Sequence, residues 1–148
     1  MKSLHGTALG LALDASSPLL GVLILGGPGA GKSRLAAELI DGCVQGRTGL
    51  IADDLISLSD EGVLLPAPQG PLLHLRGLGI ARVRAAEPCP LRFVLALGGA
   101  ALGESFPLPK AADVIPVPPE AAYAAAVRLL LASLASGETL WCGFEPGP

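Results

Sequence analysis

The sequence predicts one α/β domain, and three observations support this prediction. The chain has 148 residues, which is about the length of one typical domain. Apolar residues make up 51% of the chain and charged residues 16%, so it can bury a core and is a poor candidate for intrinsic disorder. An apolar run, a glycine-rich turn and a helical pattern follow one another between residues 19 and 42, as in α/β sheets. We expect residues 1–148 to form this domain, with 144–148 as a flexible tail.

The first part of the chain predicts a hairpin, a turn and a helix. Apolar and small residues alternate from Thr7 to Leu13, and turn-forming residues follow at 14–18, so a hairpin is expected here. The run from Leu19 to Leu25 is apolar throughout, which is typical of a strand buried on both faces. After the glycine-rich turn, apolar residues recur at helical spacing up to Gly42, where the helix is expected to end.

The remaining chain predicts short strands, a long loop and a final helix. A brief strand over Thr48–Ala52 is expected to end at Asp53-Asp54. Glycine and proline between residues 98 and 110 favour a loop, and Pro118-Pro119 is expected to open a helix through about Ala135. The other expected strands are 56–58 and 63–65, which form a hairpin, then 72–75, 80–83 and 92–97, and 114–117 as a final edge strand.

Composition excludes several classes of partner. The net charge is −3, the isoelectric point is about 5.3, and no stretch concentrates lysine or arginine, so a nucleic-acid partner is not expected. No run approaches the roughly 20 apolar residues of a membrane span. The three cysteines, Cys43, Cys89 and Cys142, lack the spacing of zinc sites or disulfide scaffolds and are expected to be small buried hydrophobic residues of a reducing compartment. We therefore expect a cytoplasmic protein without a membrane partner.

A phosphate-binding loop is the strongest motif in the chain. The segment Gly26-Gly27-Pro28-Gly29-Ala30-Gly31-Lys32-Ser33 matches the pattern G-x-x-x-x-G-K-[ST]. Its glycines let backbone N–H groups point at a phosphate, and the helix that follows offers its positive end to the anion. Lys32 would reach the β and γ oxygens, and the Ser33 hydroxyl would bind Mg²⁺. The composition predicts only roughly 0.004 chance matches per chain, so we expect nucleoside triphosphate binding.

An aspartate pair follows the phosphate-loop helix. Ligands of open α/β sheets bind at the carboxyl ends of strands, so Asp53 and Asp54 could face the γ-phosphate. One carboxylate could accept a hydroxyl proton and the other could hold Mg²⁺. Neighbouring strand residues point to opposite faces, so both reach the site only if the chain turns between them. The alternative is an ordinary Asp-Asp turn or a helix cap.

Two further side chains are candidates for catalysis. Arg76 lies beside Gly77 and Gly79 at a strand end and could neutralise charge on a transferring phosphoryl group. The alternative is a surface arginine in a salt bridge. His5, at the start of the first strand, is either a structural hydrogen-bonding residue or a catalytic one.

The order of these motifs resembles a known family. His5-Gly6, the phosphate loop, Ala52-Asp53-Asp54 and Arg76-Gly77-Leu78-Gly79-Ile80 together resemble the catalytic domain of bacterial HPr kinase/phosphorylase. The chain looks most like the short form known from alphaproteobacteria, which lacks the family's N-terminal domain. The resemblance covers Leu4 to about Val83 well and the remainder weakly. It implies a P-loop domain with a mixed sheet and flanking helices, similar to the core of phosphoenolpyruvate carboxykinase.

The resemblance also implies an activity. The family transfers phosphate from ATP to a serine of the phosphocarrier protein HPr, and many members reverse this with inorganic phosphate, producing pyrophosphate. By position, Lys32 and Ser33 would bind phosphate and Mg²⁺, and Asp53 would be the general base. Asp54 would support Asp53 and help to bind metal, and His5 would lie near the transferred phosphate. Members often assemble as hexamers, so a homo-oligomer is implied too.

Two positions depart from the family's pattern and leave alternatives open. The family has a glutamate two residues before the arginine, where this chain has His74, and Pro107 stands in the place equivalent to a phosphate-contacting arginine. A neutral imidazole binds Mg²⁺ poorly compared with a carboxylate. One alternative is therefore a non-catalytic nucleotide-binding or regulatory protein of the same fold. Another is a kinase of a small metabolite, which keeps the chemistry and changes the acceptor.

Overall fold

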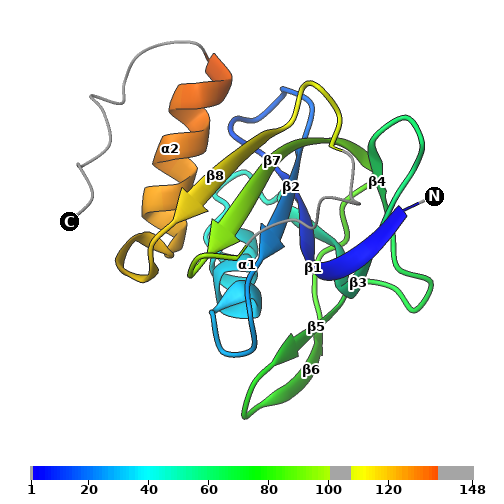
Figure 1. Cartoon of the computed structure of the whole chain (residues 1–148), viewed down its shortest axis with the longest axis vertical. Coiled ribbons are helices and arrows are strands. Elements are labelled where there is room, and N and C mark those ends of the chain that lie inside the picture. Colours follow the sequence, from blue (N-terminus) through cyan, green and yellow to red (C-terminus); the bar gives the residue numbers. More distant parts are fainter. Residues whose placement is uncertain (1, 101–107, 137–148) are drawn as a thin grey trace.

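Strands dominate residues 2–100 and 108–136, which are the residues that this computed structural model describes (Figure 1). Two α-helices and one short 3₁₀ helix accompany the strands. In chain order the elements are β1 (Lys2–Leu11), β2 (Leu20–Leu25), α1 (Lys32–Asp41), β3 (Gly49–Leu58), β4 (Val63–Leu65), β5 (Leu72–Leu75), β6 (Gly79–Arg82), β7 (Cys89–Leu97), β8 (Asp113–Val117), η1 (Pro119–Ala121) and α2 (Ala124–Ser136).

Six of the strands form one mixed sheet in the order β2-β1-β3-β4-β7-β8. Strand β1 is antiparallel to both β2 and β3, whereas β7 is parallel to β2 and to β8. Because β2 also pairs with β7, the strands β2, β1, β3, β4 and β7 form a closed series of pairings. Strand β8 pairs with β7 outside this series, as an edge strand. Strands β5 and β6 pair only with each other in the described chain and form a hairpin beside the main sheet (Figure 1). The expected α/β class and mixed sheet are confirmed.

Strand alternation divides the core into two clusters. Side chains of successive strand residues point to opposite faces, and β2 shows this directly. Val22 and Ile24 pack in the cluster that contains the buried residues of α1 and α2, whereas Leu23 and Leu25 pack in a cluster made of residues outside the helices. The expected burial of this strand on both faces is confirmed. Both helices thus cover one face, and the other face packs against residues of the strands themselves.

The two helices hold each other at their ends. The backbone N–H of Ala124, the first residue of α2, donates to Oε1 of Glu38 on α1 at 3.1 Å. In return Nη2 of Arg128 donates to the carbonyl oxygen of Leu39 at 3.4 Å. The first N–H groups and last carbonyls of a helix have no partners within the helix, so each helix supplies a partner for the other. This fixes α1, and with it the turn that precedes α1.

Two expected boundaries are wrong, and both have a local cause. Strand β3 does not end at Asp53-Asp54, because β1 continues to pair with it beyond that point, up to Lys2 opposite Leu58. The last helix does not begin at Pro118-Pro119. A 3₁₀ turn forms there, the backbone of Ala122 leaves the helical region with ψ at 58°, and α2 begins at Ala124.

The other expected elements are present. The hairpin of β1 and β2, helix α1 up to Gly42, and strands β4 to β8 are confirmed, with β7 starting three residues earlier than expected, at Cys89. Pro107, Cys142 and the expected tail at 144–148 lie outside the described residues, as does most of the expected loop at 98–110. In the described part of the chain, no helix is long and apolar enough to cross a membrane.

Candidate functional site

A pocket of about 460 Å³ joins three parts of the chain that are far apart in sequence. It lies where the start of α1, the paired strands β1 and β3, and the hairpin of β5 and β6 meet. Its lining includes four of the residues that the sequence singled out for catalysis or metal binding. The residues that line it are His5, Gly6, Lys32, Ser33, Asp53, Asp54, Gln69, Leu72, His74 and Ile80.

The phosphate loop is the turn between β2 and α1. Gly29 and Gly31 have φ angles of 80° and 95°, a left-handed conformation that residues with a side chain rarely adopt. The N–H of Leu35 donates to the carbonyl of Gly31 at 2.9 Å, so α1 begins at this glycine. No side chain in the described residues caps this end, and its first turn is free of acidic residues. The positive end of α1 is therefore available to an anion.

The Lys32 ammonium group lies over the loop. Its Nζ donates to the carbonyl oxygen of Gly26 at 2.7 Å and to that of Gly27 at 3.3 Å. Ser33, the next residue, also lines the pocket. A phosphate held by the backbone N–H groups of this turn would therefore lie beside one cation and one hydroxyl.

The Asp53 carboxylate is held by three donors. Thr7 lies directly opposite Asp53 in the β1–β3 register, and its hydroxyl donates to Oδ1 at 2.8 Å. The backbone N–H of Asp54 donates to the same oxygen at 3.0 Å, and the backbone N–H of His74 donates to Oδ2, also at 3.0 Å. The carboxylate, which lines the pocket, thus links the main sheet to β5.

A local break in strand geometry brings Asp54 to the same pocket. Alternation along β3 would direct Asp54 away from Asp53, but Asp54 has a φ of 77°, and it is the one residue other than glycine with a positive φ in the described chain. Its Oδ1 lies 3.4 Å from Nδ1 of His5. The two side chains are 89% and 81% exposed, so this contact contributes little stability. Backbone strain of this kind is concentrated at functional sites.

Arg76 lies against the phosphate loop. A Cβ atom placed on Gly29 would be 3.2 Å from its Nη1, so the guanidinium and the loop are in contact range. Arg76 does not line the pocket itself, and it is exposed at the turn between β5 and β6. The structure therefore brings a second cation to the loop, beside Lys32.

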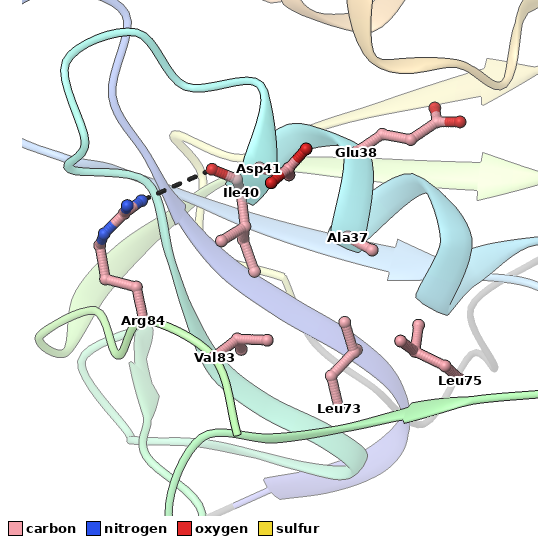
Figure 2. A pocket seen from close by; sticks show the side chains of 8 residues that line it. All are labelled: Ala37, Glu38, Ile40, Asp41, Leu73, Leu75, Val83 and Arg84. Carbon is pink, nitrogen blue, oxygen red and sulfur yellow. Dashed lines mark hydrogen bonds between the residues drawn. The ribbon is translucent and has the colours of Figure 1, made fainter. Parts of the chain in front are cut away.

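Packing of the β5–β6 segment against α1 fixes the position of this arginine. Figure 2 shows Leu73, Leu75 and Val83 opposite Ala37 and Ile40 of α1. Leu73 is fully buried in the cluster that contains both helices. The hairpin is thus attached by apolar side chains on one side, while its turn with Arg76 lies at the phosphate loop.

Three contributors to the site were missed by the sequence reasoning. These are the Thr7 hydroxyl, the backbone N–H of His74, and Gln69, which lines the pocket. Thr7 is recognisable only once the β1–β3 register is known, because the pairing places it opposite Asp53. The contact of His74 is made by its backbone, which gives no signal in the sequence.

The two described cysteines lie outside the pocket and are buried. Burial raises the pKa of the Cys43 thiol, but hydrogen bonds from Thr48, Arg47 and Gln45 outweigh that effect and lower the pKa to about 6. Burial, with a smaller contribution from Glu87, raises the pKa of Cys89. The expected burial of these two residues is confirmed.

Comparison with known proteins identifies relatives. No family model matches the chain. The HPr kinase/phosphorylase of Bordetella pertussis is 45% identical over 83 residues, which is 53% of this chain and 25% of that protein. The HPr kinase/phosphorylase of Aromatoleum aromaticum is 43% identical over 70 residues, or 44% of this chain and 21% of that protein. The chain is related to the HPr kinase/phosphorylases.

A solved structure shows the same fold. The Hpr(Ser) kinase/phosphatase from Coxiella burnetii matches with a TM-score of 0.60 and 20% sequence identity, covering 95% of this chain and 97% of that one. The sequence matches span only about a quarter of the length of the curated relatives. The resemblance to HPr kinase/phosphorylase is confirmed by sequence and by fold, whereas the alphaproteobacterial short form stays a prediction.

Proposed function

We propose that this chain is a cytoplasmic serine kinase that transfers the γ-phosphate of ATP, with Mg²⁺, to an HPr-type phosphocarrier protein. The observation that carries the proposal is the pocket itself. Its lining includes Lys32 and Ser33, at the phosphate loop, together with the hydrogen-bonded Asp53. A phosphate cradle facing a fixed proton acceptor is what phosphoryl transfer to a hydroxyl requires.

The proposed reaction follows from the acceptor positions of Asp53. A carboxylate has about four lone-pair positions, and donors in the described residues fill two on Oδ1 and one on Oδ2. The remaining position on Oδ2 would accept the proton of the serine hydroxyl. The hydroxyl oxygen then bonds to the γ-phosphorus, the bond from that phosphorus to the β–γ bridging oxygen breaks, and ADP leaves. Lys32 and Arg76 would stabilise the charge on the phosphates.

The donor atoms around the pocket fit Mg²⁺. Ser33 and Asp54 offer a hydroxyl and a carboxylate, and Mg²⁺ prefers oxygen donors, of which proteins usually supply only one or two beside substrate phosphates. Within the described residues, no group of three or more histidine, cysteine, aspartate or glutamate side chains could hold a metal alone. When bound, Mg²⁺ would neutralise phosphate charge. Ser33 and Asp54 would hold it.

Exposed apolar side chains on the segments that line the pocket favour a protein acceptor over a small metabolite. Leu55, Leu78 and Ile80 are 55%, 87% and 71% exposed, and Ile80 lines the pocket while Leu55 follows Asp54. Large exposed apolar side chains on the segments that form a site are typical of protein–protein contact. A polar metabolite would gain no binding free energy from contact with these apolar side chains. This supports the HPr-type acceptor that the named relatives indicate.

His74 stands where the family has a glutamate, but the hydrogen bond from this position to Asp53 is present. The backbone N–H of His74, not its side chain, donates to Asp53, so this contact does not require glutamate at that position. The position of the base therefore supports an active kinase rather than a non-catalytic relative. Replacing His74 with Glu tests whether the histidine at this position weakens Mg²⁺ binding. We expect the Mg²⁺ concentration that gives half-maximal activity to fall, because a carboxylate binds Mg²⁺ better than an imidazole.

The decisive experiment measures transfer of labelled γ-phosphate from ATP to HPr, together with ATP binding by calorimetry. We expect wild-type protein to phosphorylate a serine of HPr. Asp53→Asn should lower transfer at least 100-fold and leave ATP affinity within about twofold, because Asp53 belongs to β3 and not to the phosphate loop. Asp41→Asn, the same change on the far end of α1, is the matched control and should retain activity.

Two results would contradict the proposal. Undiminished transfer by Asp53→Asn would show that another group is the base. ATP binding without transfer to HPr by the wild-type protein would favour a nucleotide-binding regulatory protein or a kinase of another acceptor. A screen of serine-containing proteins and small hydroxyl compounds would separate these two. Assembly as a homo-oligomer stays a prediction.

A further inference from the structure

A buried hydroxyl donates a hydrogen bond to the proposed base. Thr7 on β1 is 0% exposed, and it is opposite Asp53 of β3 in the antiparallel register. Directly opposite residues of paired strands have their side chains on the same face and in contact. The hydroxyl of Thr7 donates to Oδ1 of Asp53 at 2.8 Å. The contact therefore joins a fully buried side chain to a residue that lines the pocket.

The surroundings of Thr7 make this contact rigid. Its strand neighbours Gly6 and Ala8 are buried, and Ala8 packs in one of the two apolar clusters. A β-branched side chain in a strand has few allowed rotamers. The hydroxyl is thus a fixed donor, held by a well-packed strand, and it defines where Oδ1 of Asp53 can lie.

This donor determines which oxygen of Asp53 faces the pocket. With Thr7 and the N–H of Asp54 both on Oδ1, and the N–H of His74 on Oδ2, the carboxylate cannot rotate without losing at least one hydrogen bond. The acceptor position that remains is on Oδ2. Of the three donors, Thr7 is the only side chain, so it is the one that a substitution can remove without altering the backbone.

We propose that Thr7 is a positioning residue for phosphoryl transfer: its hydroxyl orients the Asp53 carboxylate so that Oδ2 receives the proton of the acceptor hydroxyl. This inference rests on the proposed kinase function. It goes beyond that function by assigning a role to a residue that touches neither nucleotide nor acceptor. Thr7 acts only through Asp53.

The test compares two substitutions that separate positioning from packing. Thr7→Val keeps the shape and removes the hydroxyl, whereas Thr7→Ser keeps the hydroxyl and removes a buried methyl group. We expect Thr7→Val to lower kcat for transfer to HPr roughly 10- to 100-fold, with KM for ATP and for HPr within about twofold. Thr7→Ser should remain within about threefold of wild-type kcat although its urea midpoint falls, because it leaves a small cavity.

A purely structural role for Thr7 predicts the opposite order. Activity would then follow stability, and Thr7→Ser would be the less active variant. Wild-type kcat in Thr7→Val, or equal losses in the two variants, would overturn the proposal. Circular dichroism at the assay temperature confirms that each variant is folded before its kinetics are compared.

A second measurement tests the contact without any kinase assay. Urea unfolding of Thr7→Val, Asp53→Ala and the double variant gives a double-mutant cycle. We expect the two effects to be non-additive, because either single change removes the same hydrogen bond. Additive effects would overturn the proposal even if the protein is an active kinase. If wild-type protein does not phosphorylate HPr, the proposed function fails, and the cycle alone decides whether Thr7 holds Asp53.

Discussion

Replacing Leu73 with Ala tests how the site is assembled. Leu73 on β5 is fully buried in the cluster that contains both helices, and Figure 2 shows it facing Ala37 and Ile40 of α1. The next residue, His74, donates its backbone N–H to Asp53. Leu73 is thus one of the apolar side chains that attach the hairpin carrying His74 and Arg76 to the helix that follows the phosphate loop.

The expected magnitude follows from this burial. Removing a leucine side chain that is completely buried costs the lost transfer free energy and adds a cavity term, about 3–5 kcal/mol in total. That is a large part of the roughly 5–15 kcal/mol that stabilises a typical domain. We expect the free energy of unfolding to fall by about this amount, with an unchanged dependence on urea concentration.

The matched control is the same substitution in the turn of the same hairpin. Leu78 is 87% exposed, so Leu78→Ala should change the free energy of unfolding by less than about 0.5 kcal/mol. Its effect should instead be an increased KM for HPr, because Leu78 is an exposed apolar side chain in the turn of the hairpin that helps to line the pocket. Urea unfolding followed by circular dichroism measures the first quantity, and transfer kinetics measure the second. Equal destabilisation by the two changes would refute the packing of this hairpin against α1.

Three further predictions address the loop, the helices and the first turn. Lys32→Ala should weaken ATP binding at least tenfold in calorimetry, since it removes the ammonium beside the phosphates, and unchanged affinity would exclude nucleotide binding at this loop. Glu38→Ala should lower the free energy of unfolding by about 1 kcal/mol, as loss of a helix cap does, because Glu38 accepts the N–H of Ala124; Glu38→Gln should retain most of it. Hydrogen bonds from the hydroxyl and N–H of Ser17 and from the N–H of Ser16 lower the pKa of Asp14 to about 2. A lowered pKa stabilises the fold above the ordinary value near 4, and this effect is lost as pH falls toward 2, so Asp14→Asn should destabilise the protein at pH 7 and lose that difference at pH 2. A difference that does not depend on pH would contradict this role of the carboxylate.

The sequence by itself determined the local elements around the phosphate loop. Strand β2, the glycine turn and helix α1 were predictable because burial on both faces, positive φ angles and helical spacing each leave a direct mark on residue type. Lys32 and Ser33 were identified from the phosphate-loop motif, and Asp53 and Asp54 from their place after an apolar run; the structure brings all four to one pocket.

Only the tertiary structure decided how the site is completed. Strand β3 continues past Asp53 because β1 pairs with it there, and strand pairing depends on register, which short apolar runs do not specify. The same register places Thr7 opposite Asp53, and the fold of the hairpin brings the backbone N–H of His74 to that carboxylate. Contacts between residues 46 and 21 positions apart leave no pattern in the sequence. Local residue patterns therefore predicted the phosphate loop, whereas the geometry of the proposed base depends on long-range strand pairing.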